Sequence, residues 1–244
     1  MSTSAIRIGI DIGGTFTDFV LQNADQYFTH KLLTTHQAPE QAIMDGLQSI
    51  LSQAGCRPEE VGLIIHGTTL ATNAIIEHKG ARLAMLTSEG FRDVLELGTE
   101  SRFDQYDLNL VKPEPLVPRH LRFTVSERLG ADGSELLPLD LAYIKELAEE
   151  LKKHEIESIA ICFLHSFVNP EHEQRAAAEL RKYLPDIYIS LSSEVAPEIR
   201  EYERFSTTVA NAYIQPLIDS YLKHLAEQLQ EAGFICPLYM FLSN

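Results

Sequence analysis

The fold of this 244-residue chain is decided near its start, by the stretch Gly9-Ile10-Asp11-Ile12-Gly13-Gly14-Thr15-Phe16-Thr17-Asp18. Isoleucine occupies every second position from Ile6 to Ile12, the pattern of a strand with one buried face. Residues 15–21 are again mostly β-branched or aromatic, so the two glycines form a hairpin turn and do not open a helix, as a dinucleotide fingerprint would. A third extended segment is expected at residues 27–33. The sequence therefore predicts an antiparallel meander of three strands.

The glycine pair in the first turn is suited to binding phosphate. Glycines leave their backbone N–H groups uncovered, so an anion can approach closely. Threonine hydroxyl groups can add hydrogen bonds, and a carboxylate at the strand end can hold a Mg²⁺ ion that offsets the phosphate charge. The alternative is a plain Gly-Gly hairpin turn, which is common. The cofactor-binding candidates are Asp11, Gly13, Gly14, Thr15, Thr17 and Asp18, with Asp11 as the metal ligand.

The segments after the meander alternate between helix and strand patterns, which indicates an α/β fold. An apolar stripe of helical period runs from Ala42 to Ala54, and Gly55 can end this helix in a left-handed conformation. A short strand is expected at residues 61–65, a helix at 70–79 closed by Gly80, and another strand at 82–86.

The second half of the chain begins with a proline-rich, polar stretch. We interpret residues 91–138 as an insertion or a bridge to a second lobe, with a hairpin near Asp132-Gly133. Asp140 is placed to cap a helix, and Asn169-Pro170 to begin another. Further strands are expected at 156–164 and 187–191, followed by a long helix at 207–231 that Pro216 should kink or divide.

These patterns predict three parts. Residues 1–90 are expected to form the phosphate-loop subdomain and residues 91–200 a second α/β subdomain with the proline-rich insertion. Residues 201–244 would hold the long helix and the start of a further domain. The chain stops inside an apolar run at 238–242. Domains rarely end in mid-strand with an open edge, so we expect a fragment of a longer polypeptide.

Composition and charge argue against several classes of protein. The chain has 20 lysines and arginines against 35 aspartates and glutamates, and its net charge of -15 would repel a phosphate backbone, so no nucleic acid partner is expected. The three cysteines lack the spacing of a zinc site or a disulfide framework. Neither a signal-peptide layout nor a run of about 18 apolar residues occurs, which predicts a cytoplasmic protein with no membrane segment.

Several segments resemble known families. The loop at residues 11–15 resembles the first phosphate loop of the superfamily that includes actin, heat-shock chaperones and sugar kinases. Longer stretches are similar to the hydantoinase A and 5-oxoprolinase family and occur in the family's order along nearly the whole chain. They are HGTTLATNA at 66–74, TSEGFRDVLE at 87–96, FLHSFVNP at 163–170, and residues 194–216, which contain REYER at 200–204 and TTVANAY at 207–213.

The resemblance implies an actin-like (ribonuclease H-like) ATPase lobe with a mixed sheet. Members of the family use ATP to open lactam or imide rings, and relatives form a subunit of acetone carboxylase, where ATP activates a ketone. ATP and Mg²⁺ are therefore implied as cofactors, and a second hydantoinase-type subunit or a fused domain as a partner. The family's chain continues past this one and carries a second phosphate loop, whereas this sequence has only the loop at residues 11–15.

Residues 66–73 are a second candidate site, because they follow a strand and are expected to begin a helix whose free N–H groups favour an anion. Thr68, Thr69 and His66 are the candidate catalytic residues, with the threonines favoured over His66, and Asn73 is a candidate substrate contact. The alternative is plain helix capping by Thr68 or Thr69, with His66 as a satisfied core residue.

Two charged segments have weaker signals. Arg92 and Asp93 are candidate substrate contacts, although a surface ion pair is the more common role of such residues. The alternating charges at 200–204 predict a solvated, salt-bridged face. Signatures of a serine nucleophile elbow, a zinc hydrolase or a cysteine–histidine pair do not occur in the sequence, which disfavours covalent and zinc-dependent hydrolysis.

Together these features predict the N-terminal part of an ATP-dependent hydrolase that opens cyclic amides or imides such as hydantoin, N-methylhydantoin or 5-oxoproline. Phosphorylation of the carbonyl oxygen would activate a poor electrophile, and positioning and charge stabilisation do most of the work in phosphoryl transfer. The alternatives are a small-molecule kinase or a ketone-activating subunit of the same superfamily, or a non-catalytic lobe that binds nucleotide or a partner.

Overall fold

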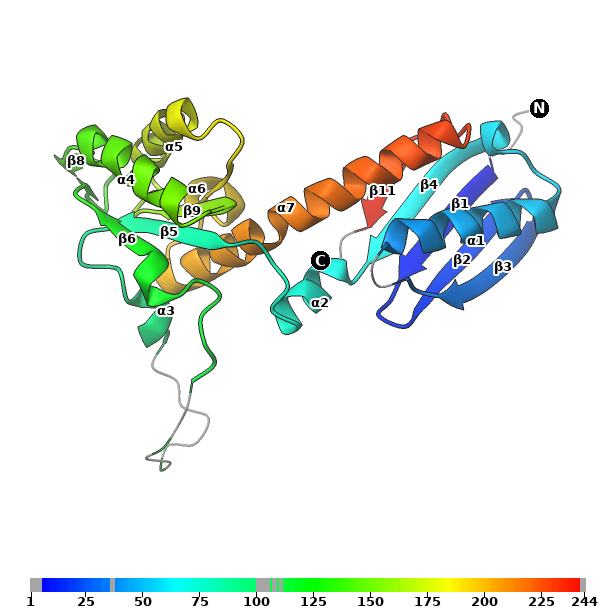
Figure 1. Ribbon diagram of the computed structural model, residues 1–244, viewed down its shortest axis with the longest axis horizontal. Coiled ribbons are helices and arrows are strands. Elements are labelled where there is room, and N and C mark those ends of the chain that lie inside the picture. The colour runs from blue at the N-terminus through cyan, green and yellow to red at the C-terminus, as the bar shows by residue number, and fades with distance from the viewer. Residues whose placement is uncertain (1–5, 36–37, 100–105, 107–108, 110–111, 242–244) are drawn as a thin grey trace. The chain divides into compact units, whose positions relative to one another are not determined.

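The chain folds into two compact units (Figure 1). The computed structural model describes residues 6–35, 38–99, 106, 109 and 112–241. Unit 1 is Met1–Glu77 with Leu217–Asn244, and unit 2 is His78–Pro216. This division differs from the boundaries expected after residues 90 and 200. The strand that follows His78 pairs with strands of unit 2, and one long helix contributes to both units.

Unit 1 contains a five-stranded sheet in the order β11-β4-β1-β2-β3. β1 (Ile6–Ile12) pairs antiparallel with β2 (Phe16–Asn23), and β2 pairs antiparallel with β3 (Gln26–Leu33), which confirms the predicted meander. β4 (Val61–Thr68) lies parallel to β1, and β11 (Leu238–Phe241) lies parallel to β4. The sheet is therefore mixed, as expected.

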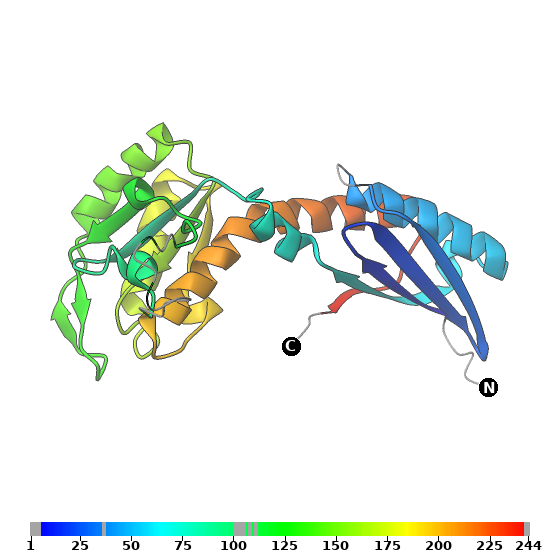
Figure 2. The same ribbon diagram turned by 90° about the horizontal axis from the view of Figure 1, so that it is seen from below.

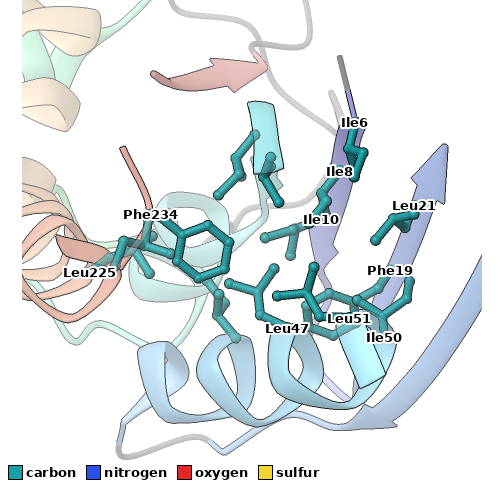
Figure 3. Packing of buried hydrophobic residues seen from close by; sticks show 14 of the residues in the cluster. Ile6, Ile8, Ile10, Phe19, Leu21, Leu47, Ile50, Leu51, Leu225 and Phe234 are labelled. Atoms are coloured by element: carbon teal, nitrogen blue, oxygen red, sulfur yellow. The ribbon is translucent and has the colours of Figure 1, made fainter. Parts of the chain in front are cut away.

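Helices cover one face of this sheet (Figures 2 and 3). α1 (Pro39–Ala54) and the C-terminal part of α7 (Glu201–Glu231) contribute to one apolar cluster with the alternate isoleucines of β1. Gly55 ends α1 with a φ of 65°, as predicted. A short 3-10 turn, η1 (Pro58–Glu60), leads into β4. At Gly46 the Phe19 ring lies 2.1 Å from where a Cβ would be, so the absent side chain lets α1 approach β2.

The pleat of β1 directs its other residues away from this cluster. Ile10 and Ile12 are buried, whereas Asp11 between them is exposed, because successive side chains of a strand point to opposite faces. The strand that supplies the core of unit 1 therefore also presents a carboxylate on the opposite face, beside the glycine turn.

Unit 2 contains a four-stranded sheet in the order β10-β9-β5-β6, in which every neighbouring pair is parallel. Two helices pack on its buried residues, and the fold class predicted from the sequence, a mixed-sheet lobe with a second α/β unit, is confirmed. The elements of unit 2 are β5 (Leu83–Ser88), α3 (Val94–Leu97), η2 (Arg119–Leu121), β6 (Arg122–Val125), β7 (Arg128–Leu129), β8 (Glu135–Leu137), α4 (Leu141–Lys153), β9 (Ser158–Cys162), α5 (Glu171–Tyr183), β10 (Tyr188–Leu191) and α6 (Ser192–Val195).

The proline-rich segment is part of unit 2 and not only an insertion. β6 lies within it and joins the sheet, with Phe123 and Val125 buried. The hairpin expected near Asp132-Gly133 is present as β7 and β8. Asp140 caps α4 as predicted, since its Oδ1 accepts a hydrogen bond from the Tyr143 N–H at 3.0 Å.

Two expectations about helix ends were wrong. α2 (Leu70–Ile76) stops before Gly80, and the Tyr213 ring lies 2.3 Å from where a Gly80 Cβ would be, so this glycine allows close packing and does not close a helix. α7 begins at Glu201 and not at Thr207. Phe205 in its first turns is buried. The charged residues that precede Phe205 in the sequence obscured this apolar anchor, so the helix start was placed too late. Of the two outcomes expected at Pro216, division of the helix does not occur, because α7 continues across this residue. A kink at Pro216 stays a prediction.

Among the described residues, no helix combines the length and the apolar character needed to cross a membrane.

Candidate functional site

The turn between β1 and β2 is held from one side by Thr34, just after β3. The Gly13 N–H donates to the Phe16 carbonyl oxygen at 2.9 Å and closes the turn. The Thr34 N–H donates to the Thr15 carbonyl oxygen at 3.0 Å, and the Thr34 hydroxyl donates to the Gly13 carbonyl oxygen at 3.0 Å. In the described part of the chain, the N–H groups of Gly14 and Thr15 have no acceptor. The carbonyl groups of Gly13, Thr15 and Phe16 thus accept hydrogen bonds within unit 1, while two N–H donors are open to an anion.

Thr17 lies beneath this turn and not at its surface. Its side chain is fully buried, and its hydroxyl lies 3.0 Å from the Thr34 hydroxyl. Because the Thr34 hydroxyl donates to Gly13, the Thr17 hydroxyl donates to Thr34. The structure therefore places Thr17 as a support for the loop, whereas Thr15 is exposed at the turn.

Asp11 has the position that a metal ligand requires. It is exposed and lies in register between Asp18 on β2 and Gly67 on β4. A Cβ at Gly67 would come within 3.3 Å of Asp11 Oδ1, so the glycine leaves space beside the carboxylate. Asp18 is engaged by Lys31, whose Nζ lies 3.0 Å from Asp18 Oδ1. Of the two acidic candidates, only Asp11 is without a cationic partner among the described residues.

These residues fit a phosphate-bound Mg²⁺. Magnesium binds through one or two carboxylates and takes its remaining ligands from substrate phosphates and water. Asp11 supplies an exposed carboxylate beside a turn with open N–H donors. In the described residues no group of three metal-ligating side chains occurs.

The start of α2 packs against the same turn. The Thr69 N–H and hydroxyl both approach the Ile12 carbonyl oxygen, at 3.1 and 3.3 Å. The Thr68 hydroxyl accepts the Leu70 N–H at 3.1 Å. Asn73 Nδ2 lies 3.4 Å from the Thr69 hydroxyl oxygen and 3.5 Å from where a Gly14 Cβ would be. The threonine hydroxyls are thus used to hold α2 beside the turn, and Asn73 is the side chain that lies next to Gly14.

His66 lies inside β4 and not at a helix start. It has no exposed surface, and its Nε2 lies 2.7 Å from the Tyr221 hydroxyl on α7. Burial lowers the pKa of His66 to about 4, against smaller opposing effects from the Ile10 backbone and the Asp11 carboxylate. Burial also raises the pKa of Tyr221. This placement is that of a core histidine, but His66 is only partly satisfied, because its buried Nδ1 has no hydrogen-bond partner among the described residues. It gives no support to a direct acid or base role.

Arg92 and Asp93 belong to unit 2 and do not pair with each other. Asp93 is bound by both Nε and Nη2 of Arg119, at 2.8 and 2.9 Å, and this hydrogen-bonded guanidinium lowers the pKa of the Asp93 carboxyl. Arg92 Nη2 donates to the Arg119 carbonyl oxygen at 2.9 Å. Asp93 thus forms a surface ion pair with Arg119, which is the alternative role that the sequence left open.

Three residues that support the site were not singled out from the sequence. Thr34 could have been suspected, because it follows the third strand directly opposite the turn. Gly67 could have been suspected once β4 was placed beside β1. Tyr221 gave no signal, since it is 155 residues from His66.

Unit 1 therefore has the features of one class of protein: an α/β lobe whose first hairpin turn is open to an anion, with an unpaired carboxylate at the end of the first strand. Residues 7–184 match the hydantoinase/oxoprolinase N-terminal region, and the chain belongs to this family.

Similar proteins include enzymes of known activity. The chain is 40% identical to the caprolactamase subunit alpha of Pseudomonas jessenii, over all of this chain and 36% of that protein. The crystal structure of the ATP-dependent caprolactamase from Pseudomonas jessenii matches with a TM-score of 0.89 at 39% identity, over 96% of this chain and 35% of that one. A nucleotide-free structure of acetone carboxylase matches with a TM-score of 0.83 at 25% identity, over 93% and 34%. The chain thus spans about a third of the length of these relatives.

Proposed function

We propose that this chain is the nucleotide-binding N-terminal part of an ATP-dependent enzyme that opens cyclic amide or imide rings. The observation that carries the proposal is the turn at Gly13 and Gly14, which has open N–H donors and lies beside the unpaired Asp11. Membership of the hydantoinase/oxoprolinase family and the similarity to an ATP-dependent caprolactamase support the choice of reaction.

The reaction needs activation because an amide carbonyl is a poor electrophile. Transfer of the γ-phosphoryl group from ATP to the carbonyl oxygen releases ADP and makes the carbonyl carbon open to attack by water. The ring C–N bond then breaks as the nitrogen takes up a proton and leaves as an amine, and the resulting acyl phosphate is hydrolysed by a second water to a carboxylate and inorganic phosphate. Bound Mg²⁺ would offset the phosphate charge during this transfer.

The chain's own residues would bind and orient the phosphates. The N–H groups of Gly14 and Thr15 would donate to phosphate oxygens, and Asp11 would hold the metal directly or through water. Thr17 and Thr34 keep the turn in place from below. Asn73 lies next to Gly14 and can donate to the same ligand. Preorganised donors of this kind supply much of the catalysis in phosphoryl transfer.

A related reaction is the second candidate. The similarity to acetone carboxylase supports activation of a ketone by ATP in place of ring opening. The same residues of unit 1 would serve either reaction, because both begin with phosphate binding. The name of the caprolactamase subunit also supports a partner: we infer that a second subunit or a fused domain completes the enzyme.

Calorimetric titration of the chain with Mg·ADP and a non-hydrolysable ATP analogue tests the proposal. We expect a submillimolar dissociation constant that rises at least roughly tenfold in Asp11→Asn, because this variant lacks the carboxylate proposed to hold the metal. A tenfold change corresponds to about 1.4 kcal/mol of binding free energy. Asp25→Asn, an exposed change in the turn between β2 and β3, is the matched control and should bind normally. Absence of binding, or equal binding by Asp11→Asn, would contradict the proposal.

A further inference from the structure

The two units are joined by two stretches of the chain. The first passes from Glu77 at the end of unit 1 to His78 at the start of unit 2, and the second returns from Pro216 to Leu217 inside α7, which continues through both units (Figure 1). Movement of one unit relative to the other must therefore bend both stretches. Their packing and their backbone hydrogen bonds decide how easily they bend.

The part of α7 at this boundary lies outside both cores. Tyr213 is buried on the side of unit 2 and Tyr221 on the side of unit 1. No residue between them, in a stretch that the structure describes in full, is buried. Most of the stability of a helix in a protein comes from packing of its apolar face, and a helical stretch shorter than about 12 residues is marginal in water without it. This part of α7 is therefore its weakest.

Pro216 weakens α7 further, at the boundary itself. A proline has no backbone N–H, so the Ala212 carbonyl oxygen receives no hydrogen bond from position 216, and the proline ring crowds the same carbonyl group. Sharp bends in helices occur at such prolines. Bending of α7 is therefore easiest at the residue where the chain passes from one unit to the other.

The other connection is an exposed turn. α2 ends at Ile76, and none of the described residues from 75 to 82 is buried. His78 has a φ of 53°, a left-handed conformation that is uncommon for residues other than glycine. The chain thus leaves unit 1 through a turn at the surface, outside any helix or strand, and the turn can change its φ and ψ angles without disturbing a core.

On the side of unit 2, both stretches are held by contacts within that unit. The Ala81 N–H donates to the Tyr213 carbonyl oxygen at 2.8 Å, and the Tyr213 ring lies 2.3 Å from where a Gly80 Cβ would be. The Ser190 hydroxyl donates to Gln215 Oε1 at 3.0 Å. Both stretches should therefore move with unit 2 as far as Gly80 and Gln215.

On the side of unit 1, the anchors are contacts of α2 and α7 with the sheet. The Thr69 N–H at the start of α2 donates to the Ile12 carbonyl oxygen at 3.1 Å, and the Tyr221 hydroxyl on α7 lies 2.7 Å from His66 Nε2. The start of α2, and α7 from Tyr221 onward, should therefore move with unit 1. The residues that can bend are those between the anchors of the two units.

We propose that residues 77–79 and 216–220 form a hinge, about which the two units change their relative orientation while each unit keeps its own fold. Both stretches lie outside the cores, a proline interrupts the hydrogen bonds of α7 in one of them, and a left-handed residue turns the chain in the other. Hinges are formed by a few residues in loops or at the ends of elements that absorb changes of φ and ψ. The hinge does not depend on the nucleotide site, so it can fail or hold separately from the proposed function.

Residual dipolar couplings of the ¹⁵N-labelled chain, measured in a weakly aligning medium, test for the hinge. The couplings of the β1 and β4 amides give the degree of alignment of unit 1, and those of the β5 and β9 amides give that of unit 2. We expect the two degrees of alignment to differ, because units that move on a hinge align independently. Equal degrees of alignment would show that the two units form one rigid body and would overturn the proposal.

A variant without the proline tests the place of the hinge. Pro216→Ala restores an N–H that can bond to the Ala212 carbonyl oxygen, so α7 should stiffen and the ratio of the two degrees of alignment should move toward one. Pro39→Ala makes the same change at the first position of α1, where a helix has no acceptor for the N–H, and it should leave the ratio unchanged. An unchanged ratio in Pro216→Ala would overturn the assignment of the hinge to this residue.

Hydrogen exchange along α7 gives an independent measurement. The amides of residues 217–220 should exchange at least roughly tenfold faster than those of residues 209–213 and 222–229, which corresponds to about 1.4 kcal/mol less protection. The reason is that opening of α7 between Tyr213 and Tyr221 exposes no buried side chain of the part of α7 that the structure describes there. Equal or slower exchange at residues 217–220 would contradict a hinge in α7.

Discussion

The two units place polar groups at the ends of parallel strands in opposite ways. In unit 2, the buried Glu173 carboxylate accepts hydrogen bonds from the Phe163 N–H, from the Ser192 hydroxyl, and from both the N–H and the hydroxyl of Ser193. In unit 1, Asp11 is exposed and the N–H groups of Gly14 and Thr15 are open. Side chains whose hydrogen-bonding groups all have partners within the protein stabilise the fold. Backbone N–H groups without an acceptor can instead donate hydrogen bonds to a ligand.

His172 extends the contrast. Its Nδ1 lies 2.7 Å from Glu127 Oε2, and its Nε2 lies 2.9 Å from Glu135 Oε2. Both ring nitrogens of His172 therefore lie within hydrogen-bond distance of a glutamate side chain. Glu127 also accepts a hydrogen bond from Ser88. By contrast, the buried histidine of unit 1, His66, pairs with a neutral phenol. The buried polar groups of unit 2 thus form a hydrogen-bonded structural network.

The largest effect is expected where the network of unit 2 loses its buried cation. Arg204→Ala leaves the Phe163 carbonyl, the Ser192 hydroxyl and the nearby Glu173 without the guanidinium, and breaking a buried pair of this kind costs about 3–5 kcal/mol. Hydrogen exchange of β9 and β10 amides measures the loss.

Arg200→Ala, an exposed arginine four residues earlier, is the control and should change exchange little. The amides of β1 should exchange normally in both variants. If Arg204→Ala lowered the free energy of unfolding of unit 2 by less than about 1 kcal/mol, the contrast between the units would be contradicted, because the network would then not stabilise unit 2.

The second effect is a loss of stability of unit 1 at acidic pH. The pKa of His66 falls from 6.5 to about 4 on burial, so the unfolded chain binds the proton more readily than the folded chain. Stability is therefore full above pH 6.5 and is lost as the pH falls toward 4, by at most about 3 kcal/mol. His66→Gln should flatten this part of the pH dependence, as measured by hydrogen exchange of β1 and β4.

The exposed His224 on α7 provides the matched control. His224→Gln should keep the pH dependence of the wild-type chain. An unchanged profile in His66→Gln would show that acid acts on unit 1 through other groups.

A third, smaller effect is expected where α1 meets the sheet of unit 1. Gly46→Ala would place a methyl group 2.1 Å from the Phe19 ring, so the ring or the helix must move. Such overpacking costs about 1–3 kcal/mol. Chemical denaturation followed at β2 amides measures the change, and Gly62→Ala, at an exposed position of β4, is a control. Equal stability of the two variants would contradict the packing described for α1.

The smallest effect is expected from the support beneath the turn. Thr17→Val removes the hydroxyl that donates to Thr34, at a cost of about 1 kcal/mol, and it should weaken Mg·ADP binding because the turn is held less firmly. Thr29→Val, at an exposed position on β3, is the control. If Thr17→Val bound Mg·ADP as tightly as the wild-type chain, the support would have no part in the site.

The first meander was predictable because its signals are local. Alternating isoleucines, a glycine pair and a β-branched run within residues 6–21 fix strands, turn and register, and the structure has the predicted arrangement. The strand β6 was missed because its four residues lie among prolines and charges, and the partner that buries Phe123 and Val125 is β5, more than 30 residues earlier.

The site was predictable in part, for the same reason. Asp11 and the glycines could be proposed from adjacent residues, whereas the roles of Thr17 and His66 depend on Thr34 and Tyr221, which folding brings from elsewhere. Charge patterns misled at residues 200–204, where Arg204 is buried although its neighbours suggested a solvated face. Burial of a single charged residue is decided by tertiary packing, which periodicity does not report.

The most direct test of the central claim follows the glycine amides of both units during a titration with Mg·ADP, with adenosine as the comparison. If the turn of unit 1 binds phosphate, Gly13 and Gly14 should shift with Mg·ADP and not with adenosine, while Gly90 and Gly98 of unit 2 stay in place. Shifts confined to Gly90 and Gly98, or no shift at Gly13 and Gly14, would contradict the assignment of the nucleotide site to unit 1.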